Sequence, residues 1–515
     1  MMTLDRSFHR MEVRVPKIRS SPSAIVLVLG VFGWLAPRAL ADSYCGLPDD
    51  GAVHLPSPAY TDVSSLPTPM GGAYLDLAFN PAVPERAGCA IRRLTDAAAA
   101  GIVPARYHHE YSNMSPFNSI STLILLHDAG YGYTLSHNSF FVVDRNGTVV
   151  RTAAEMQIDK QGEPRWSIDD PYRIYYHTVS QVPNRVMWYD VLSGTRGDVY
   201  TGTGSVNLDF AGGEGDISPD GNFLVLHVGP ISNKEYHRLD IDTGIPGPAL
   251  HSSTGHPSAI DDPCMQLNWC DMTPVTNNIV CRFDYKVGCP SSPTQYELFD
   301  GESGDMLRVI AGAGGHADLG RDINGDEIMV MTNDSDSGLT GCYPGVFKIN
   351  ISTLQRTCLL DYGHAVPPAG GSGPFTGWWG KGSHVSINNV GGHPWALVSN
   401  YDFKPSDPDT REFNPALPAD WQQRWGKYFN EILLVKLDGS QIIRLAHHRS
   451  RGVDDLTTPR AALSRDGKYV LFDSNYALQT GIAMYTDVYL LPTTYVPPPP
   501  GGGGSGGGGG GKQNE

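Results

Sequence analysis

An all-β fold, a seven-bladed β-propeller, is the architecture that the sequence predicts, with six or eight blades as the alternatives. A polar turn, often Asp-Gly or Asn-Gly, is followed by an apolar or alternating run at seven places, which begin at residues 115, 167, 218, 273, 322, 388 and 464. The first four spacings are about 50 residues, and four strands per unit of that length are typical of a propeller blade. Helical periodicity is nearly absent from the same region.

Each unit is predicted to contain two hairpins. The first is formed by the turn and its strand, as in "SPDGNFLVLHV" (218–228) and "SRDGKYVLFDS" (464–474). A second hairpin follows, as at 140–151, 237–250, 346–360 and 431–445. The last unit ends at 487–495 without an outer strand. The segment "AIRRLTD" (90–96) could supply that strand and close the ring.

Composition divides the chain into four parts. Residues 1–41 combine basic residues, an apolar stretch and the sequence Ala39-Leu40-Ala41, which together predict a cleaved secretory signal, with an uncleaved anchor as the alternative. Residues 42–89 form an N-terminal extension, 90–495 the propeller, and 496–515 a flexible Pro- and Gly-rich tail. No other stretch is apolar enough to span a membrane, so we expect a soluble mature chain. With the signal removed, we expect this chain to be secreted or periplasmic, and monomeric.

The charge argues against one class of partner, and the cysteines agree with an exported protein. Removal of 1–41 takes away six Lys and Arg and two Asp and Glu, which changes the formal charge from −16 to −20. Such an acidic chain is a poor candidate for binding nucleic acid. Its eight cysteines predict up to four disulfides. We expect Cys45–Cys89 and Cys342–Cys358, with two further bridges within 264–289 whose pairing the sequence leaves open.

The innermost strand of each blade lies just before each turn, and alternate residues on a strand share one face. Stepping back by two from each turn gives a mostly polar set that should face the central channel: His109, Tyr111, Asn113, Glu163, Arg165, Glu214, Asp216, Trp269, Asp271, His316, Asp318, Gly320, His384, Ser386, Arg460 and Ala462. The residues between them are apolar and should pack between blades: Met114, Ile168, Ile217, Met272, Leu319, Ile387 and Leu463.

The turn-and-strand units resemble a known group of propellers. "SPDGNFLVLH" and "SRDGKYVLFDS", with "IRRLTD" upstream, are similar to the WD-like repeats of TolB-type propellers over roughly residues 90–495. The resemblance implies the fold. It implies little about activity, because propellers carry many unrelated functions.

The channel residues suit cleavage of an acidic polysaccharide by β-elimination. This reaction removes the proton next to a uronate carboxylate, so it needs a base, a cation and a proton donor. We predict His109 and Tyr111 as the acid and base, and Arg165 and Arg460 as the cations. His316 and His384 are candidate ligands for a divalent metal (Mn, Zn or Ca). Asp318 and three aromatic residues are candidate substrate contacts: Trp269, Trp421 and Trp425, the last two in the long connection 400–430.

This set is weakly similar to propeller lyases of the oligogalacturonate-lyase and ulvan-lyase kind, whose first blades also carry His and Tyr near an inner strand. The sequence departs from them in lacking a close His pair of the H-x-H type, which weakens the case for a metal. The alternative is a propeller without catalytic activity that binds a glycan or a protein at the cell envelope. A channel lined with water also accommodates polar residues that have no role in chemistry.

Overall fold

The structure is a computed structural model, which describes residues 44–52, 54–57, 66–97, 99, 106–129, 138–179, 181–202, 208–229, 235–289, 294–312, 314–333, 342, 344–362, 382–389, 392–401, 427–450, 457–476 and 485–494. All of them belong to the second of two compact units, Ser43–Glu515. The predicted signal and tail therefore lie outside the described residues. No helix in the described ranges is long and apolar enough to cross a membrane.

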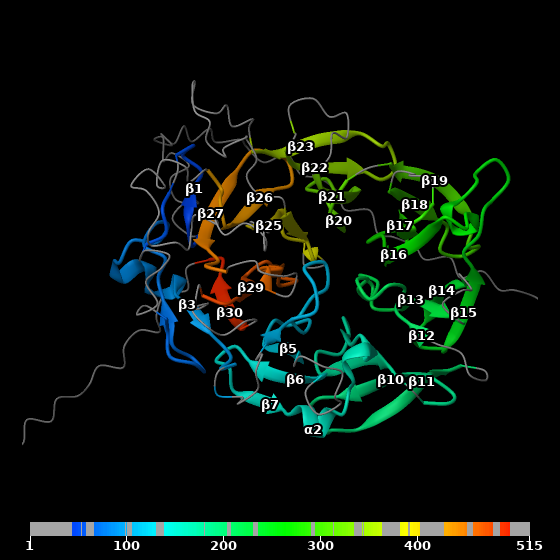
Figure 1. Ribbon diagram of the computed structural model, residues 1–515, viewed down its shortest axis with the longest axis horizontal. Helices are drawn as coiled ribbons and strands as arrows, with labels where there is room; N and C mark the ends of the chain where they lie inside the picture. Colours follow the sequence, from blue (N-terminus) through cyan, green and yellow to red (C-terminus); the bar gives the residue numbers. More distant parts are fainter. Residues whose placement is uncertain are drawn as a thin grey trace, which may run out of the picture. The chain divides into compact units, whose positions relative to one another are not determined.

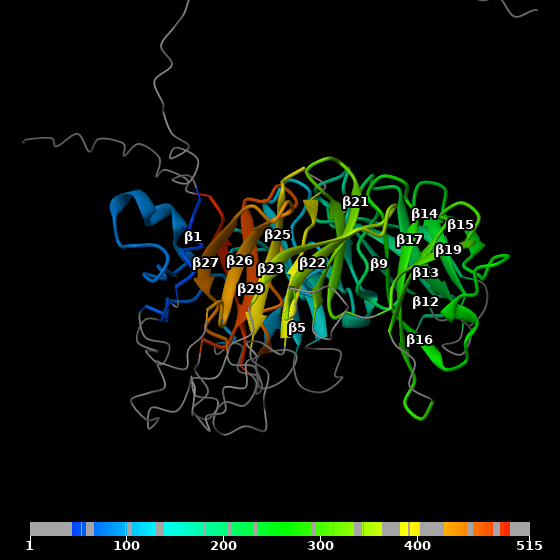
Figure 2. The same cartoon turned by 90° about the horizontal axis from the view of Figure 1, so that it is seen from above.

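The described strands form seven antiparallel sheets, which confirms the predicted propeller of seven blades. Figure 1 shows the sheets arranged around a centre, with strands β7, β11, β15, β19 and β23 at the periphery, and Figure 2 shows them from the side. In sequence order, blade 1 comprises β4 (Tyr107–His108), β5 (Leu123–Ala129), β6 (Asn138–Asp144) and β7 (Val149–Arg151). Blade 2 comprises β8 (Arg165–Trp166), β9 (Arg173–His177), β10 (Arg185–Asp190) and β11 (Arg196–Thr201).

Blades 3 to 5 repeat this four-stranded order. Blade 3 contains β12 (Leu208–Asp209), β13 (Phe223–Val228), β14 (Tyr236–Asp240) and β15 (Ile245–Ala249). Blade 4 contains β16 (Met265–Met272), β17 (Ile279–Tyr285), β18 (Gln295–Phe299) and β19 (Met306–Ala311). Blade 5 contains β20 (Ala317–Arg321), β21 (Glu327–Asn333), β22 (Gly345–Asn350) and β23 (Arg356–Asp361).

Blades 6 and 7 each have a fifth strand, which comes from the N-terminal part of the chain. Blade 6 runs from β24 (Gly382–Ser386) through β25 (Trp395–Tyr401), β26 (Glu431–Lys436) and β27 (Ile442–His447) to β1 (Leu47–Pro48). Blade 7 runs from β28 (Ala462–Leu463) through β29 (Tyr469–Ser474), β30 (Asp487–Pro492) and β3 (Ile91–Arg93) to β2 (Ala73–Tyr74). The few described helical turns are short: α2 (Ala153–Met156), η2 (Pro84–Cys89), η3 (Lys160–Gly162) and η4 (Ala259–Asp261).

The repeated turns are stabilised by their own sequence. In 218–223 and again in 464–469, the serine pairs its N–H with the carbonyl at the start of the following strand, and its hydroxyl donates to the aspartate two residues later. Gly221 and Gly467 follow with φ angles of +80° and +70°, a left-handed conformation that glycine adopts without strain. The turn therefore delivers each second strand into the sheet in a defined register.

Apolar side chains fill the space between neighbouring blades, as the alternation predicted. Six of the seven residues expected there are buried: Met114, Ile217, Met272, Leu319, Ile387 and Leu463. Ile168 is partly buried against the core between blades 2 and 3. Burial of such side chains contributes about 1.5–3 kcal/mol each, so this packing fixes which face of each inner strand is left for the channel.

The ring is closed by the segment that the sequence assigned to this task. Strand β3 pairs with β30, with Arg92 opposite Leu490 and Arg93 opposite Tyr489. The Arg93 guanidinium donates to the buried Asp487 carboxylate, Nη2 to Oδ2 at 2.6 Å. N-terminal and C-terminal strands thus share one blade, which joins the two ends of the ring.

Four disulfides connect the described cysteines, and no cysteine among these residues is free. Cys45–Cys89 and Cys342–Cys358 pair as predicted. In the cluster that the sequence left open, Cys264 bonds Cys289 and Cys270 bonds Cys281 across strands β16 and β17. Disulfides of this number are typical of proteins outside the cytoplasm.

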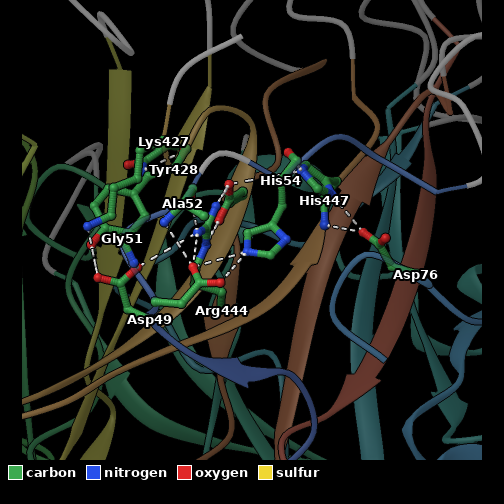
Figure 3. Close-up of polar contacts among 12 residues, drawn as sticks. Asp49, Gly51, Ala52, His54, Asp76, Lys427, Tyr428, Arg444 and His447 are labelled. Carbon is green, nitrogen blue, oxygen red and sulfur yellow. Dashed lines mark hydrogen bonds and ion pairs between the residues drawn. The ribbon is translucent and has the colours of Figure 1, made fainter. Parts of the chain in front are cut away.

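The described part of the N-terminal extension is bound to blade 6 by a buried polar network (Figure 3). Arg444 forms two hydrogen bonds with Glu431, at 2.7 and 2.5 Å, and a third with the carbonyl of Ala52 at 2.6 Å. His447 is bound to Asp76, Nδ1 to Oδ2, at 2.8 Å. Because the extension supplies partners for charges buried in blade 6, it is an integral part of the fold.

Candidate functional site

Three aromatic side chains from three different blades meet beside the inner strands. Tyr111 follows β4 in blade 1, His316 precedes β20 in blade 5, and His384 lies on β24 in blade 6. The ring centroids are 5.9 Å apart for Tyr111 and His316, 5.2 Å for Tyr111 and His384, and 4.4 Å for His316 and His384. Residues that are far apart in the sequence therefore share one location, as the channel register predicted.

Blade 7 adds a cation to this group. Arg460, two residues before β28, places its guanidinium carbon 5.1 Å from the centroid of the Tyr111 ring. Its Nη1 donates to the carbonyl of Glu110 at 3.2 Å. The backbone of Arg460 is left-handed, with φ of +41°. A non-glycine residue in this region is strained by about 1–3 kcal/mol, and such strain is frequent at functional sites. We call Tyr111, His316, His384 and Arg460 the channel cluster.

His384 is the most unusual member of the channel cluster. The side chain is fully buried and stacks on Tyr401 with a centroid distance of 4.7 Å. Neither of its ring nitrogens has a hydrogen-bond partner among the described residues. Burial, followed by the positive charges that His316, Arg460 and His109 can carry, holds the pKa of His384 well below its usual value. A neutral imidazole with two unsatisfied nitrogens is a feature that a polar ligand would complete.

His316 and Tyr111 form the accessible face of the channel cluster, since both are half-buried. The Nδ1 atom of His316 lies 2.8 Å from the carbonyl oxygen of Ser383, which can only accept a hydrogen bond. The hydrogen is therefore on Nδ1, and the lone pair of the neutral ring is on Nε2. A carbonyl that fixes one ring nitrogen in this way sets the tautomer needed for a base.

His109 lies next to the channel cluster, but its hydrogen bonds point into the protein. Its Nδ1 is 3.2 Å from Oδ1 of Asp473, and its Nε2 is 2.6 Å from the carbonyl oxygen of Arg460. Both ring nitrogens are thus engaged by oxygen atoms of the chain. This arrangement does not present a lone pair to a substrate, so the geometry favours a supporting role for His109 over the predicted role of acid or base.

Arg165 does not join the channel cluster. The side chain is buried, and its three guanidinium nitrogens donate to the carbonyls of Gly215, Pro164 and Gly213 at 2.5, 3.1 and 2.7 Å. The cation therefore holds two consecutive blades together. Its donors are directed at the main chain, which leaves Arg460 as the better placed of the two predicted cations.

Asp318 belongs to a second polar group of the channel. Its two oxygens accept from the N–H groups of Leu319 and Ile387, at 2.8 and 2.5 Å. Burial, and then the carboxylate of Asp216, raise the pKa of Asp318 to about 8, and the pKa of buried Asp271 is raised for the same reasons. A cavity of about 30 Å³ beside these three carboxyl groups is large enough for water and too small for a sugar.

Hydrogen bonds across the channel surround this cavity. Oδ2 of Asp216 in blade 3 accepts from the N–H of Ser115 in blade 1 and from the guanidinium of Arg465 in blade 7, both at 3.0 Å. The carboxyl groups thus connect inner segments of blades that are not neighbours. Asp318 is better explained as part of this cross-channel support than as a substrate contact.

The predicted aromatic contacts divide into two cases. Trp269 is buried between blades 4 and 5, where its ring meets Tyr296 at 6.0 Å, and it offers no face to a sugar. Burial of the large indole in the apolar core is more favourable in free energy than its exposure in a channel filled with water. Trp421 and Trp425 lie outside the described residues.

The described residues alone do not fit a metal centre. His316 and His384 would supply two imidazole nitrogens, but no group of three His, Cys, Asp or Glu side chains with the geometry for a metal occurs within the described ranges. Catalytic zinc sites use three protein ligands, and manganese and calcium sites use more oxygen ligands. The described side chains are therefore the groups that can take part in chemistry at this site.

Sequence reasoning missed one residue of the site, Asp473. It is a fully buried acid on β29, and it directly follows the mostly apolar run "YVLF" of the same strand. An acidic residue at the end of a buried strand needs a partner, and this was the signal that could have identified it. The partner, His109, is in blade 1 and cannot be inferred from the local sequence.

No protein-family model matches the sequence, and no curated protein matches it. Solved structures with a similar fold include an oligogalacturonate lyase in complex with manganese, which is 14% identical with a TM-score of 0.46 and matches 79% of this chain and 93% of that one. An oligogalacturonate lyase from Vibrio parahaemolyticus is 12% identical, with a TM-score of 0.45 over 78% and 93% of the two chains. TolB from Acinetobacter baumannii is 13% identical, with a TM-score of 0.34 over 63% and 64%. Likenesses at this level carry no information on activity.

Proposed function

We propose that this chain is an exported, monomeric propeller that cleaves uronate-containing glycans by β-elimination. The observation that carries the proposal is the channel cluster, in which one phenol and two imidazoles have ring centroids 4.4 to 5.9 Å apart, and a guanidinium from a fourth blade lies 5.1 Å from the phenol ring. Groups suited to proton transfer and to binding an anion act together only when they can reach one substrate.

In the proposed reaction, His316 is the base. The tautomer set by the Ser383 carbonyl directs the lone pair of the neutral ring to Nε2, which accepts the proton from the sugar carbon next to the carboxylate. The electrons of that C–H bond form the new carbon–carbon double bond. The bond to the glycosidic oxygen breaks, and the leaving oxygen takes a proton from the Tyr111 hydroxyl.

The positive charge of Arg460 supports this step. As the proton leaves, negative charge builds up on the substrate carboxylate, and a guanidinium in a site with little water stabilises that charge strongly. Arg460 lies over Tyr111, so a carboxylate paired with it would be beside the proton donor.

The test is to incubate the purified protein with a panel of uronate polymers and follow the ultraviolet absorbance of the unsaturated product, with and without chelator and added Mn²⁺, Zn²⁺ or Ca²⁺. We expect product from at least one polymer. The variants H316Q, Y111F and R460Q should lose about 10²–10⁴-fold in kcat/KM. The matched control is H393Q, which alters a half-buried imidazole outside the cluster. No product from any polymer under any metal condition would contradict the proposal.

A second candidate function is binding without catalysis, of a glycan or of an envelope protein. One observation favours it: Arg165 and His109, two of the predicted catalytic residues, direct their hydrogen bonds at the chain itself. The same panel distinguishes the two functions. Saturable binding of a uronate polymer that yields no product, and that R460Q weakens, would support the binding protein and reject the lyase.

A further inference from the structure

A line of hydrogen bonds leads from a buried acid in blade 7 to the cation of the channel cluster. Asp473 on β29 has no exposed surface, and its Oδ1 lies 3.2 Å from Nδ1 of His109. On the other side of the imidazole, Nε2 is 2.6 Å from the carbonyl oxygen of Arg460. The guanidinium of Arg460 in turn lies over the ring of Tyr111. His109 thus bridges the acid and the main chain of the cation.

The two partners of His109 restrict where its ring hydrogens can lie. The carbonyl oxygen of Arg460 can only accept, so Nε2 of His109 must carry a hydrogen. Nδ1 either donates to the ionised Asp473 or accepts a hydrogen from the protonated acid. In both cases one oxygen of Asp473 orients the imidazole, and the ring directs its Nε2–H at the carbonyl of Arg460.

The main chain of Arg460 needs this support. Its φ of +41° is a conformation that costs a non-glycine residue about 1–3 kcal/mol, and it persists only where neighbouring contacts hold it. Contacts that do so include the His109 hydrogen bond on the carbonyl and the hydrogen bond from the guanidinium Nη1 to the carbonyl of Glu110 at 3.2 Å. If the first is lost, the residue can relax and the guanidinium moves relative to Tyr111.

We propose that Asp473 is a positioning residue: acting through His109, it holds Arg460 where the guanidinium meets the carboxylate of an anionic sugar. The assignment of the substrate carboxylate to Arg460 rests on the proposed function. The positioning of Arg460 by Asp473 does not, so it can be tested separately.

Two substitutions separate the hydrogen bond from the charge. In Asp473→Asn, the amide donates to Nδ1 of a neutral His109, whose Nε2–H still reaches Arg460, so the position of the cation is retained. In Asp473→Leu, Nδ1 of His109 loses the partner that orients the imidazole toward Arg460. The matched control is Asp76→Leu, which breaks another buried Asp–His pair, Asp76–His447 at 2.8 Å, between the N-terminal extension and the end of β27. It should lower stability and leave the site intact.

Side-chain nitrogen NMR of the full chain, labelled at His and Arg, gives a readout that needs neither ligand nor activity. We expect the Arg460 signals to keep their wild-type pattern in D473N and D76L, and the Arg460 Nε signal to shift in D473L. For an active enzyme, D473L should raise KM about tenfold, with a smaller change in kcat, and D473N should restore it. For a binding protein, D473L should raise the Kd for a uronate oligosaccharide about tenfold.

The outcomes are distinguishable. If Arg460 signals and KM or Kd in D473L equal those of the wild type, the positioning role is rejected, whatever the activity. If D76L changes them as much as D473L does, the effect is general destabilisation, which also rejects the role. A shifted Arg460 signal in D473L alone, in a protein that yields no unsaturated product, keeps the positioning role and rejects the lyase.

Discussion

Histidines with lowered pKa values are the clearest consequence of this fold for single residues. His384, His393 and His448 have lowered pKa values, with burial as the largest cause in each case, and the value is about 4 for His393 and about 3 for His448. In the unfolded chain an imidazole has a pKa near 6.5. The folded protein therefore releases protons that the unfolded chain would keep at mildly acidic pH.

The sign of the resulting pH dependence follows from linkage. Between about pH 6.5 and the lowered pKa values, the unfolded state binds more protons, so the free energy of unfolding should fall as the pH is lowered from 7 to 5. H384Q removes one of the groups that bind a proton only in the unfolded state. The fall in the free energy of unfolding should therefore be less steep by about 1.4 kcal/mol per pH unit. Urea unfolding at a series of pH values measures this. H256Q, at an exposed imidazole, is the control, and equal slopes for H384Q and wild type would refute the prediction.

At the scale of elements, the N-terminal strands determine which sheet edges are covered. β1 pairs with β27 and β2 with β3, so the outer edges of blades 6 and 7 are occupied by the chain itself. Unpaired sheet edges are sites of aggregation, and covering them protects the fold. The disulfide Cys45–Cys89 closes the segment between these strands and fixes it against the ring.

Removing this disulfide should therefore loosen the extension. The double variant C45S/C89S opens a loop that spans 44 residues, which should lower the free energy of unfolding by about 2–4 kcal/mol. It should also make the chain around 44–57 sensitive to protease in the native state. C342S/C358S, which opens a loop of 16 residues within blade 5, is the comparison. Its protease pattern at 44–57 should match the wild type, and cleavage there in both variants would count against the specific role of Cys45–Cys89.

For the whole molecule, the decisive feature is that first and last strands share blade 7. The closing contact is the buried pair Arg93–Asp487, and Asp487 also accepts from the hydroxyl of Thr95 at 2.7 Å and the N–H of Ala97 at 2.8 Å. Because the ring has no free end within the described blades, its stability depends on a joint made by residues almost 400 positions apart.

Asp487→Ala should open this joint. It leaves the buried guanidinium of Arg93 without its partner, and such a loss costs about 3–5 kcal/mol. Calorimetry should show a lower Tm. Asp198→Ala is the matched control, since Asp198 and Arg185 form an exposed pair at 3.0 Å on blade 2 whose loss costs about 0–1 kcal/mol. If the two variants lower the Tm equally, the Arg93–Asp487 pair is not what closes the ring.

Local sequence was sufficient for the fold because each blade repeats one pattern. Turns such as those at 218 and 464 select their own conformation. Alternation separates the apolar residues of the blade interfaces from the polar residues of the channel, and a missing outer strand at 495 requires a supplement such as 90–96.

The site was predictable only as a set of residues that face one axis. Whether a channel residue is available or already engaged depends on partners in other blades. Arg165 meets carbonyls of blade 3, Asp318 meets an N–H of blade 6, and His109 meets the acid of blade 7. Hydrogen bonds between residues hundreds of positions apart leave no periodic signal along the chain, so only the folded ring separates the supporting side chains from the channel cluster.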